Sequence, residues 1–220
     1  MHIRIILFIS SLLIYQASKS QNNEIKLNLG ANRSNVISNP KDIFSIEDGF
    51  KTGINTELIF KHSFQEPFYS GGGLGFIQKG YKFNIHLTDE NGENLSVSKS
   101  SLTLNYLTIP LYFGIETGEN FYFMASFGIT PSILLKATLD SELPNWGGEA
   151  TDQTDRFDLT AQLRLGVGKN LNRQFRMEIN VAFHQSLIQT DFNNNNASNQ
   201  DQYNNLGTVF NLGLGYKIVK

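Results

Sequence analysis

The chain has no cysteine, and it contains only 5 prolines and 1 tryptophan among its 220 residues. The missing cysteine excludes disulfide bonds, thiolate metal sites and a lipid-modified amino-terminal cysteine. Beyond residue 20, no apolar run reaches the ~20 residues that a membrane-spanning helix needs, because polar residues interrupt the apolar ones at nearly every second position. Any insertion of this part of the chain into a membrane must therefore use strands.

The sequence also lacks an excess of positive charge. The formal net charge is −2, and removal of residues 1–20 takes away Arg4 and Lys19 without any acid, so that −2 becomes −4. This balance suggests no nucleic-acid partner. The 4 histidines are scattered, and the acids of residues 139–155 lack the fixed spacing of a calcium loop, so we predict no metal site and no cofactor.

The amino terminus carries the features of an export signal. Arg4 precedes an apolar run over residues 5–15, and the small residues Ser18 and Ser20 stand before a cleavage point ahead of Gln21. This pattern is typical of a secretory signal peptide. An uncleaved anchor is the alternative, but the run is too short for a ~30 Å hydrocarbon core. We predict a signal peptide over residues 1–20 and a single domain over residues 21–220.

Phenylalanine, tyrosine and glycine are abundant, with 17, 8 and 19 copies, as suits sheets with crowded aromatic faces. Period-two alternation predicts eight strands. Pro110 lacks a ladder donor and predicts a bulge or break inside the fourth of them. The glycine cluster over residues 71–75 is interpreted as strand glycines rather than a phosphate loop. The predicted strands cover residues 24–32, 50–61, 68–83, 101–115, 121–138, 156–168, 174–189 and 206–218.

The connections between the predicted strands alternate in length. Three are short, over residues 62–67, 116–120 and 169–173. The other four are long and polar, and cover residues 33–49, 84–99, 139–155 and 190–205. Short turns at one rim and long loops at the other are typical of bacterial outer-membrane barrels, in which both termini lie on the periplasmic, short-turn side.

The stretch "FRMEINVAFHQ", residues 175–185, places phenylalanine, methionine, isoleucine and valine on one face, and Arg176, Glu178, Asn180 and His184 on the other. An eight-stranded barrel is just wide enough inside for side chains to fill, and the bulky apolar groups would overfill it. We therefore predict an all-β, eight-stranded antiparallel up-and-down transmembrane β-barrel, with the apolar face toward lipid. The alternative is a soluble secreted lipocalin-like ligand-binding barrel with the apolar face inward.

Three stretches, "YLTIPLYFGIETG" (106–118), "FYFMASFGITPSILL" (121–135) and "NLGLGYKI" (211–218), resemble the PorT-like outer-membrane β-barrel family of Bacteroidetes-type bacteria. The resemblance implies a location in the outer membrane, and founding members are linked to protein secretion and gliding. The family offers no catalytic residue. The chain departs from many outer-membrane barrels in ending "GYKIVK", so Tyr216 or Ile218 would have to serve as the terminal assembly signal.

Charged residues on the predicted inner faces form the first candidate site. We expect Arg164 to lie opposite or near Glu178 with Arg176 as a neighbour. Lys26, Glu57 and Lys51 would extend this network. The network is either a gate or ion path, or a packed polar plug, and the narrow interior favours the plug.

Two further features bear on function. His184 and Ser186 in "FHQS" fall on one face, as in a lipid-modifying outer-membrane hydrolase, but no asparagine directly follows Ser186 and no glutamate occurs after Glu178. The asparagine-rich loop over residues 191–205 could contact glycans, surface proteins or secretion partners, with a disordered tract as the alternative. We predict a monomeric structural or interaction protein of the outer membrane, in contact with its lipid, and not an enzyme.

Overall fold

The computed structural model describes residues 23–39, 49–64, 66–88, 94–144, 147–192 and 201–218. The predicted signal peptide and most of the asparagine-rich tract lie outside these residues. In the described part of the chain, no helix is long and apolar enough to cross a membrane. The elements are β1 (Asn23–Asn39), β2 (Gly49–Ser63), β3 (Phe68–Thr88), β4 (Asn94–Thr108), β5 (Leu111–Thr117), β6 (Phe121–Ser141), β7 (Gly148–Glu149), the 3₁₀ turn η1 (Thr151–Gln153), β8 (Phe157–Asn170), β9 (Phe175–Ser186), β10 (Thr190–Phe192) and β11 (Asp201–Ile218).

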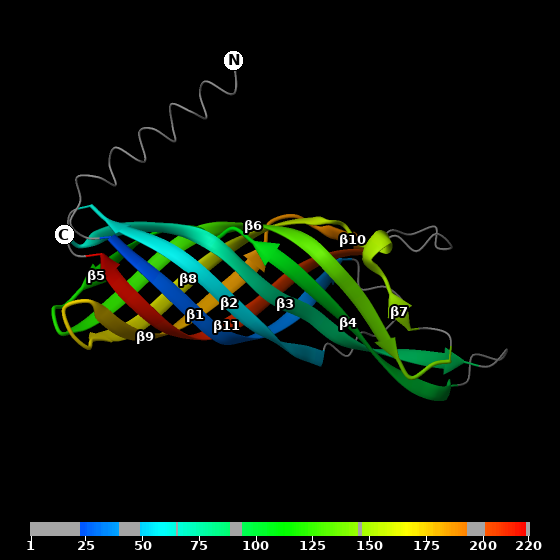
Figure 1. Cartoon of the computed structure of the whole chain (residues 1–220). Helices are drawn as coiled ribbons and strands as arrows, with labels where there is room; N and C mark the ends of the chain where they lie inside the picture. The colour runs from blue at the N-terminus through cyan, green and yellow to red at the C-terminus, as the bar shows by residue number, and fades with distance from the viewer. Residues whose placement is uncertain are drawn as a thin grey trace, which may run out of the picture.

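The strands form one closed antiparallel barrel (Figure 1). The wall has eight positions, which we call staves. Seven are single strands, and β4 and β5 together make the eighth; in order around the ring they are β1, β2, β3, β4 with β5, β6, β8, β9 and β11. Each stave pairs with the next, and β11 pairs with β1 along its whole length. These eight staves confirm the predicted eight-stranded up-and-down barrel. Closure leaves the long strands with no free edge. The start of β1, the end of β11 and the short turns lie at one end of the cylinder, and the strand ends that border the long connections lie at the other (Figure 1).

The fourth stave is broken where the sequence predicts it. β4 ends at Thr108 and β5 begins at Leu111, so Ile109 and Pro110 separate them. The wall stays closed because the Pro110 carbonyl accepts the Gly73 N–H at 3.1 Å, while the Ile109 N–H donates to the Pro131 carbonyl at 2.9 Å. A register shift between Asn105 and Tyr106 adds the bulge.

The two faces of β9 decide which side of the barrel is apolar. Arg176, Glu178, Asn180 and His184 are at most 5% exposed, whereas the alternating apolar side chains of this strand are largely exposed. The same arrangement holds on every stave, and together the exposed side chains form an apolar band around the cylinder. An apolar surface of this extent suits lipid contact. The lipocalin-like alternative, with its apolar face inward, is wrong.

Beyond the apolar band, apolar side chains point into the barrel and charged side chains point outward. Tyr81, Leu102 and Ala137 point inward and are buried, while Lys82 and Lys136 point outward and are exposed. β3 and β6, with 21 residues each, are longer than the 9–11 residues that a spanning strand needs. The barrel wall therefore continues past the band as a water-facing sheet, visible as the overhang of β3, β4 and β6 in Figure 1.

This overhang differs from the sequence prediction, which assigned residues 84–99 to a loop. β3 continues to Thr88 and β4 begins at Asn94, so much of that segment is strand. The polar composition of the segment hid the strands, because its outer face meets water instead of lipid. An apolar cluster reaches from the overhang into the barrel, and it contains Val36, Ile77, Tyr81, Leu102, Leu104, Tyr106, Leu134, Ala137, Ala150, Ala182 and Val209.

Candidate functional site

The lumen below the apolar cluster is filled by paired charges. Their numbers balance, as a buried site requires, because a charge without a partner is costly to remove from water. In the described residues, the inward-pointing charges that form ion pairs are the cations Lys26, Lys61, Lys79, Arg164 and Arg176 and the acids Glu24, Glu57, Glu116, Asp158 and Glu178. Lys217 also shares the inner face, opposite Glu24 at the end of the barrel.

The first group of charges lies near the end of the barrel that holds the termini. Arg176 on β9 reaches Glu24 of β1 at 2.9 Å and Glu116 of β5 at 2.7 Å. Lys61 of β2 pairs with the same two acids, and its nitrogen lies 3.7 Å from Glu24 Oε2. The Arg176 guanidinium also stacks over the Tyr122 ring at 3.6 Å. These contacts tie together five staves, those of β1, β2, β5, β6 and β9.

The second group crosses the middle of the barrel. Lys26 Nζ lies 2.8 Å from Glu178 Oε1, which also accepts a hydrogen bond from Asn180. Arg164 donates to both oxygens of Glu57, at 2.8 and 2.9 Å. Hydrogen bonds from ionised partners at these distances belong to the strong class. Arg164 of β8 and Glu57 of β2 face each other across the lumen, whereas Lys26 of β1 and Glu178 of β9 meet over the strand between them, β11.

The third group lies next to the apolar cluster. Lys79 of β3 donates to Asp158 Oδ2 and to the Thr160 hydroxyl of β8, both at 2.9 Å. Ser186 of β9 donates to the same carboxylate oxygen at 3.1 Å. The His184 Nε2 atom lies 3.0 Å from Asn32 Oδ1. This group connects β1, β3, β8 and β9 at the height where the lumen changes from polar to apolar.

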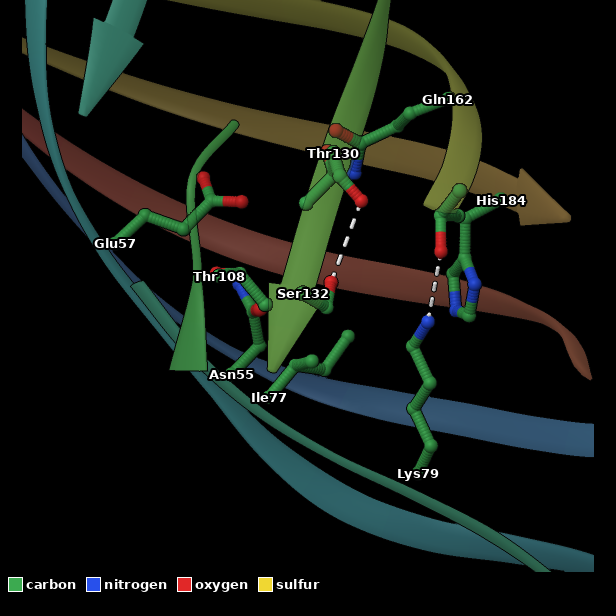
Figure 2. A pocket seen from close by; sticks show the side chains of 10 residues that line it. Asn55, Glu57, Ile77, Lys79, Thr108, Thr130, Ser132, Gln162 and His184 are labelled. Atoms are coloured by element: carbon green, nitrogen blue, oxygen red, sulfur yellow. Dashed lines mark hydrogen bonds between the residues drawn. The ribbon is translucent and has the colours of Figure 1, made fainter. Parts of the chain in front are cut away.

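A cavity of about 20 Å³ lies between the second and third groups. Its size suits roughly one water molecule, since a water needs ~10–15 Å³ of this kind of volume. Figure 2 shows Glu57, Gln162, His184 and Lys79 around it, with the Lys79 amine directed at the Thr160 hydroxyl. A space of this size offers no continuous path for hydrated ions.

Glycines on the inner face make room for the charged side chains. A Cβ on Gly215 would lie 2.0 Å from Glu24 Oε1 and 2.7 Å from Arg176 Cγ. A Cβ on Gly168 would lie 2.1 Å from the ring of Tyr122. The glycines that alternate with apolar residues along the strands therefore leave the space into which the side chains of the lumen pack. Gly71, Gly72, Gly73 and Gly75 all lie within strand β3, as interpreted from the sequence.

All five residues of the predicted charge network are buried, but their partners differ from the expected ones. Arg164 lies opposite Ala182 on the neighbouring strand, and Glu178 lies opposite Gly168. The two residues are therefore not directly opposite each other, because the turn between β8 and β9 sets another register, but they are near enough for their charges to interact, as expected. The actual partners come from strands that are not neighbours in the sheet: Glu57 of β2 lies across the lumen from Arg164, and β1 supplies the partners of Arg176 and Glu178 over the intervening β11. Lys51 stays out of the network and pairs loosely with Asp140, at 3.9 Å.

Sequence reasoning missed Glu24, Lys61, Lys79, Glu116 and Asp158. Two of them could have been found from the alternation of side chains along a strand. Glu24 is two residues from Lys26 and Lys61 is four residues from Glu57, so each shares the inner face with a predicted residue. Glu116 was hidden by the break at Pro110. Lys79 of β3 was missed because the register between β2 and β3 is irregular in this region, with a shift between Phe50 and Asn55.

The geometry around His184 and Ser186 does not resemble a catalytic pair. Both side chains are buried in the lumen, away from the apolar band. Ser186 donates to Asp158, while His184 contacts Asn32, and in the described structure no hydrogen bond joins the two. A serine nucleophile needs its base within hydrogen-bond reach. The described residues also contain no cluster of histidines and acids with metal-binding geometry.

Solved structures of outer-membrane proteins have similar folds. OprG from Pseudomonas aeruginosa shares 12% sequence identity with a TM-score of 0.52, over 92% of this chain and 98% of that chain. The attachment invasion locus protein Ail of Yersinia pestis shares 13% identity with a TM-score of 0.44, over 89% and 98% of the two chains. The outer membrane protease OmpT from Escherichia coli shares 11% identity with a TM-score of 0.45, over 91% and 98%. At 12% identity the likeness to OprG shows the fold alone.

No curated protein matches the chain by sequence. The sequence model of a protein family, described as "Outer membrane protein beta-barrel domain", does match, and it covers residues 15–182. This range is more than half of the chain, and it agrees with the lipid-type surface of the barrel. The chain therefore belongs to the outer membrane protein beta-barrel domain family, whose members reside in the outer membrane of Gram-negative bacteria.

Proposed function

We propose that this protein is a non-conducting, non-enzymatic barrel of PorT-like type, which holds its long-loop end at the cell surface for interaction with secretion or surface proteins. Both termini face the periplasm in this arrangement. The observation that carries the proposal is the filled lumen, in which five cations and five acids are paired beneath an apolar cluster. A barrel without a path through it acts through its surfaces and not through transport.

Conductance measurements test the plug. We expect the purified mature protein to give no stable current steps in planar bilayers. A variant with Lys26, Glu57, Arg164 and Glu178 all replaced by serine removes two ion pairs of the lumen together, so it keeps the charge balance and serves as the open control. A reproducible ohmic pore in the wild type would contradict the proposal.

Single cysteines test the orientation, since the chain has none of its own. Asp152 is exposed at the long-loop end, and Glu119 is exposed in a short turn. We expect a membrane-impermeant maleimide to label Asp152→Cys in intact cells, and to label Glu119→Cys only after the outer membrane is permeabilised. The reverse pattern would place the termini at the cell surface.

The role in secretion is tested by shortening a loop. A short glycine-serine linker replaces residues 193–200, and the same replacement in the short turn over residues 171–174 is the control. We expect the first variant to change the profile of secreted proteins as much as deletion of the whole protein does, while the barrel still assembles. An unchanged profile in the deletion strain would exclude the secretion role and leave a surface-interaction role to be tested.

A further inference from the structure

The wall of the barrel has an irregular seam between β2 and β3. Regular pairing of the two strands ends where Asn55 lies opposite Ile77, and it resumes only at the start of β2. Between the paired stretches, residues 51–54 of β2 face residues 78–80 of β3, and the register assigns them no partners in each other. On its other side, β2 keeps an unbroken register with β1 over the same residues. An extra residue in one strand disrupts the ladder locally, so this seam is held less firmly than its neighbour.

Two glycines allow the strands to pass each other at this seam. Gly80 of β3 has a φ of +149°, which residues with a side chain rarely adopt. A Cβ on Gly53 of β2 would lie 2.3 Å from the Gln78 carbonyl oxygen. The irregular seam is therefore specified by the sequence, because neither position accepts a side chain without a shift of the backbone.

Side chains of β1 bridge the seam. The Ser34 hydroxyl donates to the Gly80 carbonyl and accepts a hydrogen bond from the Gly80 N–H, both at 2.9 Å. The Asn32 Nδ2 atom donates to the Gln78 carbonyl at 2.8 Å. Both side chains are fully buried. β1 thus supplies hydrogen-bond partners to the backbone of β3 at the height where the β2–β3 register is interrupted.

His184 of β9 orients the Asn32 amide. Because the Asn32 nitrogen is directed at the Gln78 carbonyl, the Asn32 oxygen faces His184 Nε2, at 3.0 Å. An amide oxygen only accepts hydrogen bonds, so His184 carries its proton on Nε2. His184 is 5% exposed, and a donor at this place keeps Asn32 turned toward β3. His184 is therefore a positioning residue that acts through Asn32.

The seam borders the cavity of the lumen. Asn55 and Ile77, the last regular pair, line this cavity together with Lys79 and His184 (Figure 2). On the outer side, the seam lies at the apolar band, where Ile54 is 60% exposed. Separation of β2 and β3 at this point would connect the cavity with the outside of the barrel wall.

We propose that Asn32, Ser34 and His184 form a clasp that holds the β2–β3 seam shut, and that this seam is the side opening through which water and small neutral molecules reach the cavity. Local opening of a protein occurs where the backbone ladder is least stable. The paired charges below the cavity stay in place when the seam opens, so the opening gives access to one cavity and not a path through the barrel. The inference goes beyond the proposed function and depends neither on the orientation of the barrel nor on a role in secretion.

Hydrogen exchange of the mature protein in lipid vesicles, followed by mass spectrometry, locates the opening. We expect the amides of residues 51–54 and 78–80 to exchange at least about tenfold faster than those of residues 163–167 and 179–183, which pair without interruption between β8 and β9. Equal protection of the two seams would overturn the inference. Protection at the β2–β3 seam with fast exchange at the break between β4 and β5 would also overturn it.

Thiol labelling tests the clasp. Thr108→Cys places a single thiol in the lining of the cavity, since the chain has no cysteine of its own. The reagent is methyl methanethiosulfonate, which is small and neutral, and labelling is followed by mass spectrometry. In this background we expect Ser34→Ala to speed labelling about tenfold and His184→Leu roughly fivefold, because each removes hydrogen bonds of the clasp.

Two matched variants separate the clasp from general loosening of the barrel. His184→Gln keeps an N–H donor near the place of Nε2, and Ser126→Ala removes a buried hydroxyl from a regularly paired part of β6. We expect both to change the labelling rate less than about twofold. Equal rates in all variants, or equal acceleration by Ser34→Ala and Ser126→Ala, would overturn the clasp. Equal acceleration by His184→Gln and His184→Leu would overturn the positioning role of His184. A heat-dependent gel shift verifies folding, and the exchange pattern of the wild type decides the inference without any substitution.

Discussion

Arg164 and Glu57 are 107 residues apart in the chain, yet the Arg164 Nη2 atom lies 2.8 Å from Glu57 Oε2 across the lumen of the barrel. Both side chains are buried, and Asn28 donates to the same carboxylate at 2.8 Å. A buried pair of this kind favours one closed arrangement of the strands, because either charge would be costly to bury without its partner.

Removal of one partner of this pair should destabilise the barrel strongly. We expect Glu57→Gln to lower the free energy of unfolding by about 3–5 kcal/mol, because it leaves the Arg164 guanidinium buried without a counter-charge. Urea unfolding in lipid vesicles, followed by tryptophan fluorescence or gel shift, measures the loss. The exposed pair Asp152–Arg156 is the matched control, and Asp152→Asn should cost less than about 1 kcal/mol. Equal effects of the two substitutions would show that the lumen is hydrated.

A side chain at Gly215 should disturb the charges at the end with the termini. Gly215→Ala places a Cβ 2.0 Å from Glu24 Oε1, so Glu24 must move away from Arg176. We expect a lower temperature of the heat-dependent gel shift. Gly72→Ala is the control on the outer face, where the new Cβ meets the flexible end of Leu111 at 3.0 Å. A larger effect of the control would contradict the packing of the lumen described above.

A charge on the apolar band should oppose insertion. Ile179 is 62% exposed in the middle of the outer face of β9. We expect Ile179→Arg to cost about 2–4 kcal/mol of folding free energy in vesicles, the amount typical of arginine at the midplane of a bilayer. Gln185→Arg, on the same strand beyond the band, should cost about 0–1 kcal/mol. Equal stability of the two variants would mean that the band does not face lipid.

Loss of the Ser186 hydroxyl should affect stability and not lipid chemistry. Ser186→Ala removes one hydrogen bond to Asp158, so we expect a loss of about 1 kcal/mol in unfolding free energy. Mass spectra of lipid A should be the same in cells that express the wild type, the variant or neither. Lipid A that loses an acyl chain only in the presence of the wild type would restore the hydrolase hypothesis.

The sequence by itself determined the number of staves, the break at Pro110 and the face that meets lipid. These features depend on neighbours in the chain, because alternation along a strand and the missing N–H of proline are local properties. The same alternation assigned Arg164, Arg176 and Glu178 to the lumen. Local pattern also explains the error at residues 84–99, since a strand with its outer face in water resembles a polar loop in composition.

Only the tertiary structure decided which charges meet. Arg164 pairs with Glu57, Lys26 with Glu178, and Arg176 with Glu24 and Glu116, all through contacts between strands that are not neighbours in the sheet. Strand parity assigns a side chain to the inner face, but its partner depends on the register of every intervening pair and on closure between β1 and β11.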